Sequence, residues 1–221
     1  MRQVPEAVHA MKSVKQPRPW SIRKRAFGML ALLLASAALT SGCSPWRIIP
    51  PENVSNPAPV YITRYASHTR LALPFEDGTR GVEYGYGDWH WYAKRETGAW
   101  SGFRAVLLPM DGAYSRREIP WPDSAETFQR RLGGNHTEKL MVESERASTL
   151  RKALEEMWQS LGEAEEVGHP RTGAVYRRAG EAYHLFSNSN QQTASWLKAL
   201  DCRVRGIQVG GEFRVERSPP P

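Results

Sequence analysis

One apolar run divides this chain into a short leader and a longer part that has to fold by itself. Residues 26–39, AFGMLALLLASAAL, are 14 apolar or small residues that follow a basic cluster, SIRKR, at positions 21–25. A membrane-spanning helix needs about 20 apolar residues, so this run is short for a span. A basic segment followed by such a run is typical of a secretory signal peptide. We expect the signal peptide to occupy residues 1–42, with translation starting at Met1 or Met11.

The residues that follow the run indicate where the leader would be cleaved. Ser41 and Gly42 are small, and Cys43 comes directly after them. This pattern resembles the bacterial lipobox, although a leucine is usual where this chain has Thr40. The resemblance implies lipidation on Cys43, with the membrane of the bacterial cell envelope as partner, and Ser44 favours the outer membrane, facing the periplasm. An ordinary signal peptide, or a membrane anchor with an incidental cysteine, is the alternative.

The positive charge of the chain belongs to its leader. The whole sequence carries 30 basic and 23 acidic residues, a formal charge of +7. Seven of the basic residues and one of the acidic residues precede Cys43, which leaves 23 basic and 22 acidic residues in the rest of the chain. A nearly neutral mature chain gives no electrostatic case for binding nucleic acid.

The mature part has to be stabilised by its core rather than by disulfides. If Cys43 is lipidated, Cys202 has no cysteine with which to pair inside the chain. We expect Cys202 to be a small buried apolar residue rather than a reactive thiol. Residues 43–58 are rich in Pro, Asn and Ser, which predicts a tether. The folded domain is expected over residues 59–217, followed by a disordered tail, 218–221.

The mature sequence shows both strand-like and helix-like spacing of apolar residues. The expected strands are 60–65, 70–73, 80–91, 113–121, 139–143, 182–186 and 207–215. The expected helices are 98–108, 144–161 and 190–200. Because strands and helices mix without strict alternation, the predicted fold class is α+β, with a mixed or antiparallel sheet and packed helices.

Three segments, taken in order, resemble an uncharacterised bacterial family, domain of unknown function 2459, first noted beside urease genes. They are VYITRYASHTRLALP at 60–74, VEYGYGDWHWY at 82–92 and YHLFSNSNQQTASWLKAL at 183–200. The family looks like a circularly permuted relative of papain-like and cell-wall peptidase folds. The resemblance therefore implies a permuted papain-like arrangement for residues 59–217.

In that arrangement a strand histidine precedes a cysteine at a helix N-terminus, where the helix dipole and the imidazolium lower the thiol pKa. Carried over by position, the base is His68 and the cysteine position is Ser189, while Gln192 stands where the family has a tryptophan. Ser189 would need full general-base help from His68, since it has no thiol. Asp88 would either orient His68 or stabilise the glycine-rich turn near it.

Other candidates are weaker. Glu83 is a second acidic residue in the same motif, and His68 has a structural alternative as a strand-end residue bonded to the backbone. The aromatic stretch 84–92 would line a groove for sugar or peptide, or pack in the core. The remaining histidines after the leader lack the spacing of a metal site, so no metal or other cofactor is expected. They are His90, His136, His169 and His184.

Two functions remain open at this point. One is a non-catalytic, membrane-anchored domain, degenerate in its peptidase-like site, whose partner is cell-wall peptide or an envelope protein. The other is an envelope hydrolase that acts on amide or ester bonds through Ser189 and His68. The geometry of that pair is the observation that distinguishes them.

Overall fold

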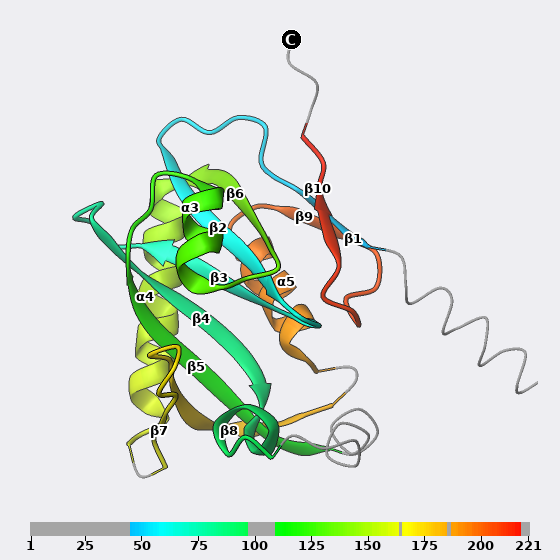
Figure 1. Cartoon of the computed structure of the whole chain (residues 1–221). Helices are drawn as coiled ribbons and strands as arrows, with labels where there is room; N and C mark the ends of the chain where they lie inside the picture. Colours follow the sequence, from blue (N-terminus) through cyan, green and yellow to red (C-terminus); the bar gives the residue numbers. More distant parts are fainter. Residues whose placement is uncertain (1–44, 97–108, 164, 185–186, 218–221) are drawn as a thin grey trace, which may run out of the picture. The chain divides into compact units, whose positions relative to one another are not determined.

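The computed structural model describes residues 45–96, 109–163, 165–184 and 187–217, all of them within the compact unit Gly42–Pro221 (Figure 1). The strands are β1 Trp46–Ile49, β2 Pro57–Tyr65, β3 His68–Pro74, β4 Arg80–Asp88, β5 Met110–Pro120, β6 His136–Glu143, β7 Val167–Gly168, β8 Val175–Tyr183, β9 Arg203–Arg205 and β10 Phe213–Val215. The helices are a short π-helix, Trp89–Ala93, and α3 Ala125–Leu132, α4 Ser144–Ser160 and α5 Ser189–Ala199.

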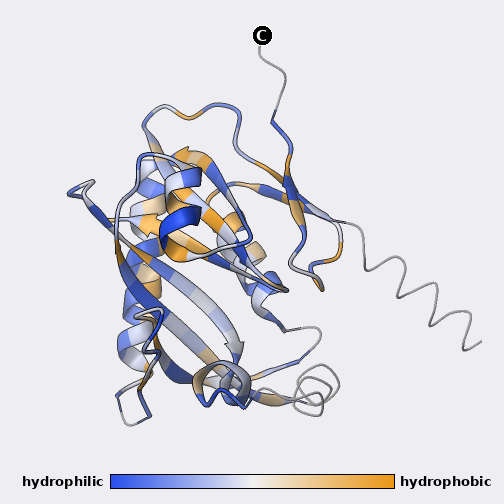
Figure 2. Cartoon of the chain, viewed as in Figure 1, coloured by the Kyte–Doolittle hydropathy of each residue, from blue (hydrophilic) through white to orange (hydrophobic). Residues whose placement is uncertain are grey.

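Seven of the strands form one sheet in the order β6-β2-β3-β4-β5-β8-β7. Every neighbouring pair in this sheet is antiparallel. A largely antiparallel sheet with packed helices confirms the predicted α+β class. In Figure 2, apolar residues gather on β2, β3 and β6, whereas β4 and β5 are more polar along their length.

The two faces of the sheet are covered by different elements because side chains alternate along each strand. Val60 and Ile62 belong to the large core cluster, which also contains the buried residues of α4 and α5. Tyr61, between them, points the other way and packs against Phe128 of α3, with ring centroids 4.8 Å apart. The helices α4 and α5 therefore cover one face, and α3 covers part of the other.

A second, three-stranded sheet, in the order β10-β1-β9, differs from the tether expected over residues 43–58. Trp46 and Ile48 of β1 are buried in the large core cluster. Their apolar alternation was hidden by the Pro, Asn and Ser residues around them, and their partner strands come from the other end of the chain. Residues 46–49 are therefore part of the folded domain, ahead of the boundary expected at residue 59.

Other boundaries also differ from the prediction. The expected strand 207–215 is a turn followed by the short β10, and Ile207 is 60% exposed. The strand expected at 182–186 overlaps only the end of β8, which stops at Tyr183. The strand expected at 80–91 stops at Asp88, whose side chain caps the π-helix that follows. Helix α3 was not predicted, although Ser124 caps its N-terminus through a side-chain bond to the N–H of Thr127. The helix expected at 98–108 lies outside the described residues.

The core of the domain, as far as the described residues show it, lies within residues 46–215. All three core clusters are drawn from this range. Cys202 is 3% exposed within it, and burial raises the pKa of its thiol to about 12, which confirms the expected inert role. None of the helices in the described ranges is both long and apolar enough to span a membrane.

Candidate functional site

His68 is the first residue of β3 and pairs with Tyr65 across the hairpin that joins β2 to β3. Its ring stacks on the Tyr65 ring at a centroid distance of 5.8 Å, and its Nδ1 lies 3.2 Å from the Tyr92 hydroxyl. Burial, followed by the positive charge of Arg70, lowers the pKa of His68 to about 3. The ring is therefore neutral at physiological pH and is a weak base.

Ser189 is the first residue of α5 and is 1% exposed. Burial, the largest effect, raises the pKa of Tyr183, and its contacts with the Ser189 hydroxyl and backbone N–H lower it. The neighbouring Asn188 caps the helix, because its Oδ1 accepts from the backbone N–H groups of Asn190 at 2.9 Å and Gln191 at 3.1 Å. These N–H groups are the ones that would otherwise stabilise an anion at the helix N-terminus.

The sheet separates His68 from Ser189. Thr69 faces α5, since its hydroxyl donates to the Asn190 Oδ1 at 3.1 Å and its carbonyl accepts from the Thr193 hydroxyl at 3.2 Å. The adjacent residue His68 points to the opposite face, where Tyr65 and Tyr92 contact it. No hydrogen bond joins the His68 ring to the Ser189 hydroxyl, both of which the structure describes. The proposed base and nucleophile are near in the fold but are not coupled.

The Asp88 side chain caps the π-helix that follows β4 and makes no hydrogen bond with His68, which the structure also describes. Its Oδ1 accepts from the Trp91 backbone N–H at 2.6 Å, which caps the π-helix Trp89–Ala93. Its Oδ2 is buried without a hydrogen-bond partner, and burial is the main cause that raises the pKa of Asp88. Neither role expected from the sequence is seen, because Gly85 and Gly87 lie within strand β4, where there is no turn for Asp88 to stabilise, and no hydrogen bond joins Asp88 to His68 in the described structure.

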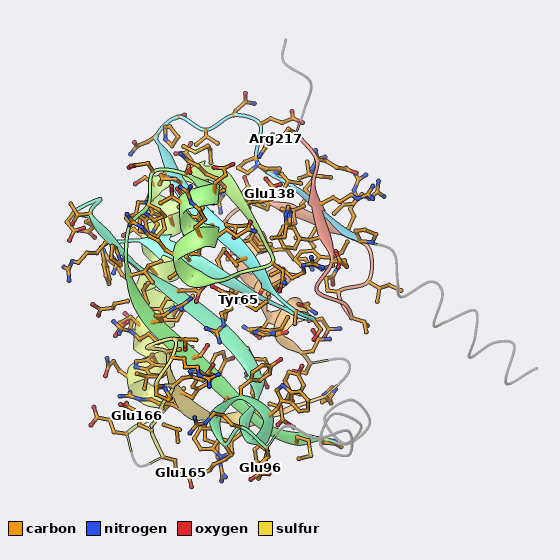
Figure 3. All side chains as sticks on the ribbon, viewed as in Figure 1. Tyr65, Glu96, Glu138, Glu165, Glu166 and Arg217 are labelled. Carbon is orange, nitrogen blue, oxygen red and sulfur yellow. The ribbon has the colours of Figure 1, made fainter. Side chains whose placement is uncertain are left out.

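Glu83 is the centre of a buried polar network on the His68 face of the sheet. Its side chain is 1% exposed. Its Oε1 accepts from the Tyr65 hydroxyl at 2.8 Å, and its Oε2 accepts from Arg117 at 2.6 Å and from Arg70 at 3.3 Å. Arg70 also donates to the Tyr176 hydroxyl at 2.8 Å. Figure 3 shows Tyr65 on this part of the sheet.

The carboxylate and hydroxyl groups of this network are hydrogen-bonded to other members of it, so they are not available as reactive groups. The Glu83 carboxylate lies between two guanidinium groups, and both of its oxygens accept hydrogen bonds from these groups or from Tyr65. Burial, followed by the charge of Glu83, raises the pKa of the Tyr65 phenol far above its usual range. The phenol therefore stays protonated and donates. These groups order the sheet behind His68 and offer neither a free base nor a nucleophile.

Comparison with known proteins adds no assignment. No family model matches the chain, and no curated protein and no solved structure matches it. The interpretation of the site consequently depends on the contacts just described.

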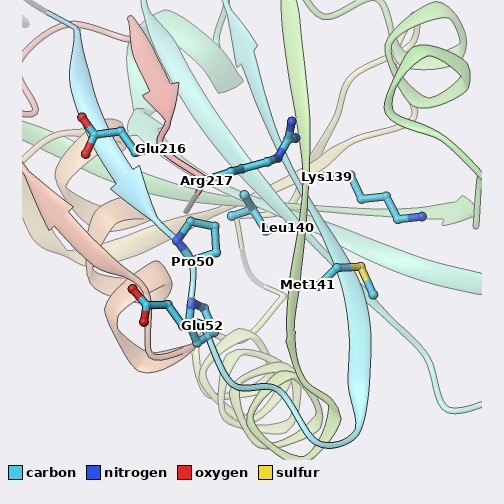
Figure 4. A pocket seen from close by; sticks show the side chains of 8 residues that line it. Pro50, Glu52, Lys139, Leu140, Met141, Glu216 and Arg217 are labelled. Carbon is cyan, nitrogen blue, oxygen red and sulfur yellow. The ribbon is translucent and has the colours of Figure 1, made fainter. Parts of the chain in front are cut away.

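The aromatic stretch and the surface pockets do not extend the site. Tyr84, Tyr86 and Trp89 are buried core residues rather than the lining of a groove. A pocket between the segment after β1, strand β6 and the end of β10 contains none of the proposed catalytic residues (Figure 4). Within the described ranges, no group of three or more His, Cys, Asp or Glu side chains is arranged to hold a metal ion.

Sequence reasoning missed several of the residues that define this region. Tyr183 and Tyr176 carry no local signal that links them to Ser189 or to Arg70. The opposition of Glu83 and Arg117 follows from the register of β4 and β5, in which they are direct partners. Tyr92, Glu83 and Tyr183 all stood in segments that the sequence had singled out, but without the contacts seen here. Tyr176 and Arg117 lay outside those segments, and only the strand register brings them to the network.

Proposed function

We propose that this chain is a lipid-anchored protein of the bacterial cell envelope whose domain has a degenerate cysteine-peptidase-like site and no hydrolytic activity. One observation carries the second half of the proposal: the His68 ring is hydrogen-bonded to Tyr92, and no hydrogen bond joins it to the Ser189 hydroxyl, both of which lie in the described part of the chain. A general base must lie within hydrogen-bonding reach of the proton that it removes. This pair does not meet that condition.

The arrangement of α5 and β3 supports descent from a peptidase-like site. The N-terminus of α5 packs on the first residues of β3 through Asn190, which bonds to Thr69 and to the Ser67 carbonyl. This is the relation between helix and strand that the resemblance to the family of unknown function implies. A permuted papain-like ancestry and membership of that family are part of this proposal.

Two further observations favour a loss of catalysis over catalysis by a serine nucleophile. The Asn188 side chain occupies the N–H groups that would stabilise a tetrahedral oxyanion at the helix N-terminus. The lowered pKa of His68 leaves a base that is too weak to activate a serine hydroxyl. The remaining roles are binding and scaffolding at the envelope, with the outer membrane, facing the periplasm, as the expected location.

A fluorophosphonate probe tests the absence of a reactive serine. We expect the mature chain to remain unlabelled, alongside a serine hydrolase that labels under the same conditions. The variants Ser189→Ala and His68→Ala serve as matched references. Labelling of the wild-type chain that disappears in both variants would establish the hydrolase instead.

The lipid anchor is tested separately in cells. Wild-type protein is expected to incorporate labelled palmitate and to fractionate with membranes, and the signal-peptidase inhibitor globomycin is expected to cause the precursor to accumulate. In Cys43→Ser the label and the membrane fractionation are both expected to be lost. Unlabelled, freely soluble mature protein in wild-type cells would refute the anchor.

A further inference from the structure

The small sheet has one apolar face and one exposed face that carries a group of arginines. Trp46 and Ile48 point into the core, and between them Arg47 points outward and is exposed. The neighbouring strands repeat the pattern, with exposed Arg205 in β9 and exposed Arg214 in β10. We call Arg47, Arg205 and Arg214 the arginine face.

The register places these three arginines in a row. Arg47 is the direct partner of Arg205 in the antiparallel pair and of Arg214 in the parallel pair. Like charges directly opposite each other across strands destabilise a sheet. Arg47 forms an ion pair with Glu216 at 3.0 Å, but no ion pair is formed by Arg205 or Arg214 within the described part of the chain. Within the described residues, the charges of Arg205 and Arg214 are therefore not compensated by the fold, which leaves them available for an anionic partner.

Some exposed arginines of the domain are paired with carboxylates, whereas others, such as Arg131 and Arg171, form no ion pair within the described residues. Arg217 lies 2.9 Å from Glu138, and the two are seen side by side in Figure 3. Arg80 lies 3.2 Å from Asp77. Even Arg203, which neighbours the arginine face, lies 3.6 Å from Glu52. The uncompensated charge of this sheet is therefore concentrated at Arg205 and Arg214.

An exposed apolar residue lies beside the row. Ile207 follows β9 and is 60% exposed. The adjoining Gly206 packs against Trp46, because a Cβ on this glycine would lie 3.3 Å from the Trp46 Cα. Trp46 is the first residue of β1, so Ile207 is at the end of the sheet where the chain arrives from Cys43. Two residues, Ser44 and Pro45, separate Cys43 from Trp46, so their Cα atoms are at most about 11 Å apart.

We propose that the arginine face and Ile207 form a docking surface for the anionic phospholipid bilayer that holds the lipid on Cys43. This inference rests on the proposed anchor, which would bring the sheet within reach of the headgroups. Basic residues near an anionic bilayer each strengthen binding by about fivefold. An apolar side chain inserted between headgroups adds to this attraction. Docking would fix the orientation of the domain and compensate the opposed arginines with lipid phosphates.

The test separates docking from lipidation by using a chain without the lipid. The mature chain carrying Cys43→Ser is suitable, since every described core cluster lies within residues 46–215. Its partition onto vesicles is measured by sedimentation at several salt concentrations, with phosphatidylcholine alone or mixed with phosphatidylglycerol. We expect binding that requires phosphatidylglycerol and weakens as salt rises.

Substitutions then locate the surface. The double variant Arg205→Gln/Arg214→Gln breaks no ion pair and is expected to lower the partition coefficient by about 30-fold. The matched control is Arg131→Gln/Arg171→Gln, which removes the same charge from two exposed arginines elsewhere and should bind as the parent does. Ile207→Ser is expected to weaken binding without changing its salt dependence.

Equal binding to both kinds of vesicle, or equal losses in the two double variants, would overturn the docking surface. The palmitate experiment on Cys43 decides the anchor independently of this result. A labelled protein whose unlipidated form ignores anionic vesicles would retain the anchor and refute the docking surface. Charge-specific vesicle binding with no palmitate on Cys43 would support the arginine face and refute the anchor.

Discussion

Removing the charge of Glu83 gives a stringent test of the buried network. Glu83→Gln keeps the shape of the side chain but leaves Arg70 and Arg117, each 7% exposed, without their shared carboxylate. Breaking a buried pair by removing one partner costs about 3–5 kcal/mol, because the remaining charge stays buried. The whole free energy of unfolding of such a domain is about 5–15 kcal/mol. The substitution should therefore remove a large fraction of the stability.

Urea unfolding of the mature chain measures this loss directly. We expect a lower midpoint with little change in slope, and a melting temperature lower by about 6–20 °C for a domain of this size. The control is Glu118→Gln on β5, whose side chain is 48% exposed although it lies 2.8 Å from Arg116. A surface ion pair of this kind is worth about 0–1 kcal/mol. A similar cost for both substitutions would refute the assignment of Glu83 as the centre of a buried ionic network.

Three further outcomes are expected from urea unfolding. Trp46→Ala should cost about 3–5 kcal/mol, since its indole is buried against Phe213, and a cost below about 1 kcal/mol would return β1 to the tether. Asn188→Ala should cost about 0.5–2 kcal/mol by removing the cap of α5; no loss would contradict the capping contact. Because the pKa of His68 falls from 6.5 in the unfolded chain to about 3 in the fold, the unfolded state binds more protons between these values. The contribution of His68 to the free energy of unfolding is then complete above pH 6.5 and declines on acidification, by up to about 1.4 kcal/mol per pH unit. His68→Gln should flatten this slope, and an unchanged slope would show that His68 does not cause it.

The strands and helices that the sequence predicted well are those with long, regular periodicity. Val60 and Ile62 alternate with Tyr61 and lie in a central strand that is buried on both sides. Leu150 and Leu154 lie one helical turn apart and face the core from α4. In both cases the local pattern and the final burial agree, because each element is long enough for its face to be read from spacing alone.

The small sheet could not be predicted in the same way. Strand β1 has four residues and is a strand only because it pairs with residues more than 150 positions away, such as Phe213. The same limit applies to the site. His68 and Ser189 were selected by position in a resemblance, but whether they meet depends on strand alternation at His68 and Thr69. Contacts between distant segments decided both cases, and no local propensity carries that information.

The position of strand β1, close to Cys43 in the sequence, changes what a lipid anchor at Cys43 would do. A flexible tether of 16 residues has a root-mean-square length of about 20–24 Å, which lets a domain tumble freely above a bilayer. With β1 beginning at Trp46, only two residues separate the strand from Cys43, and the surface around Trp46 is necessarily close to the headgroups. The residues exposed around Trp46 would consequently contact or repel the headgroups. Arg205 and Arg214 have no ion-pair partner among the described residues, so an anionic membrane beside them would supply the counter-charge that the fold does not. The proposed anchor and the proposed docking surface would then act together.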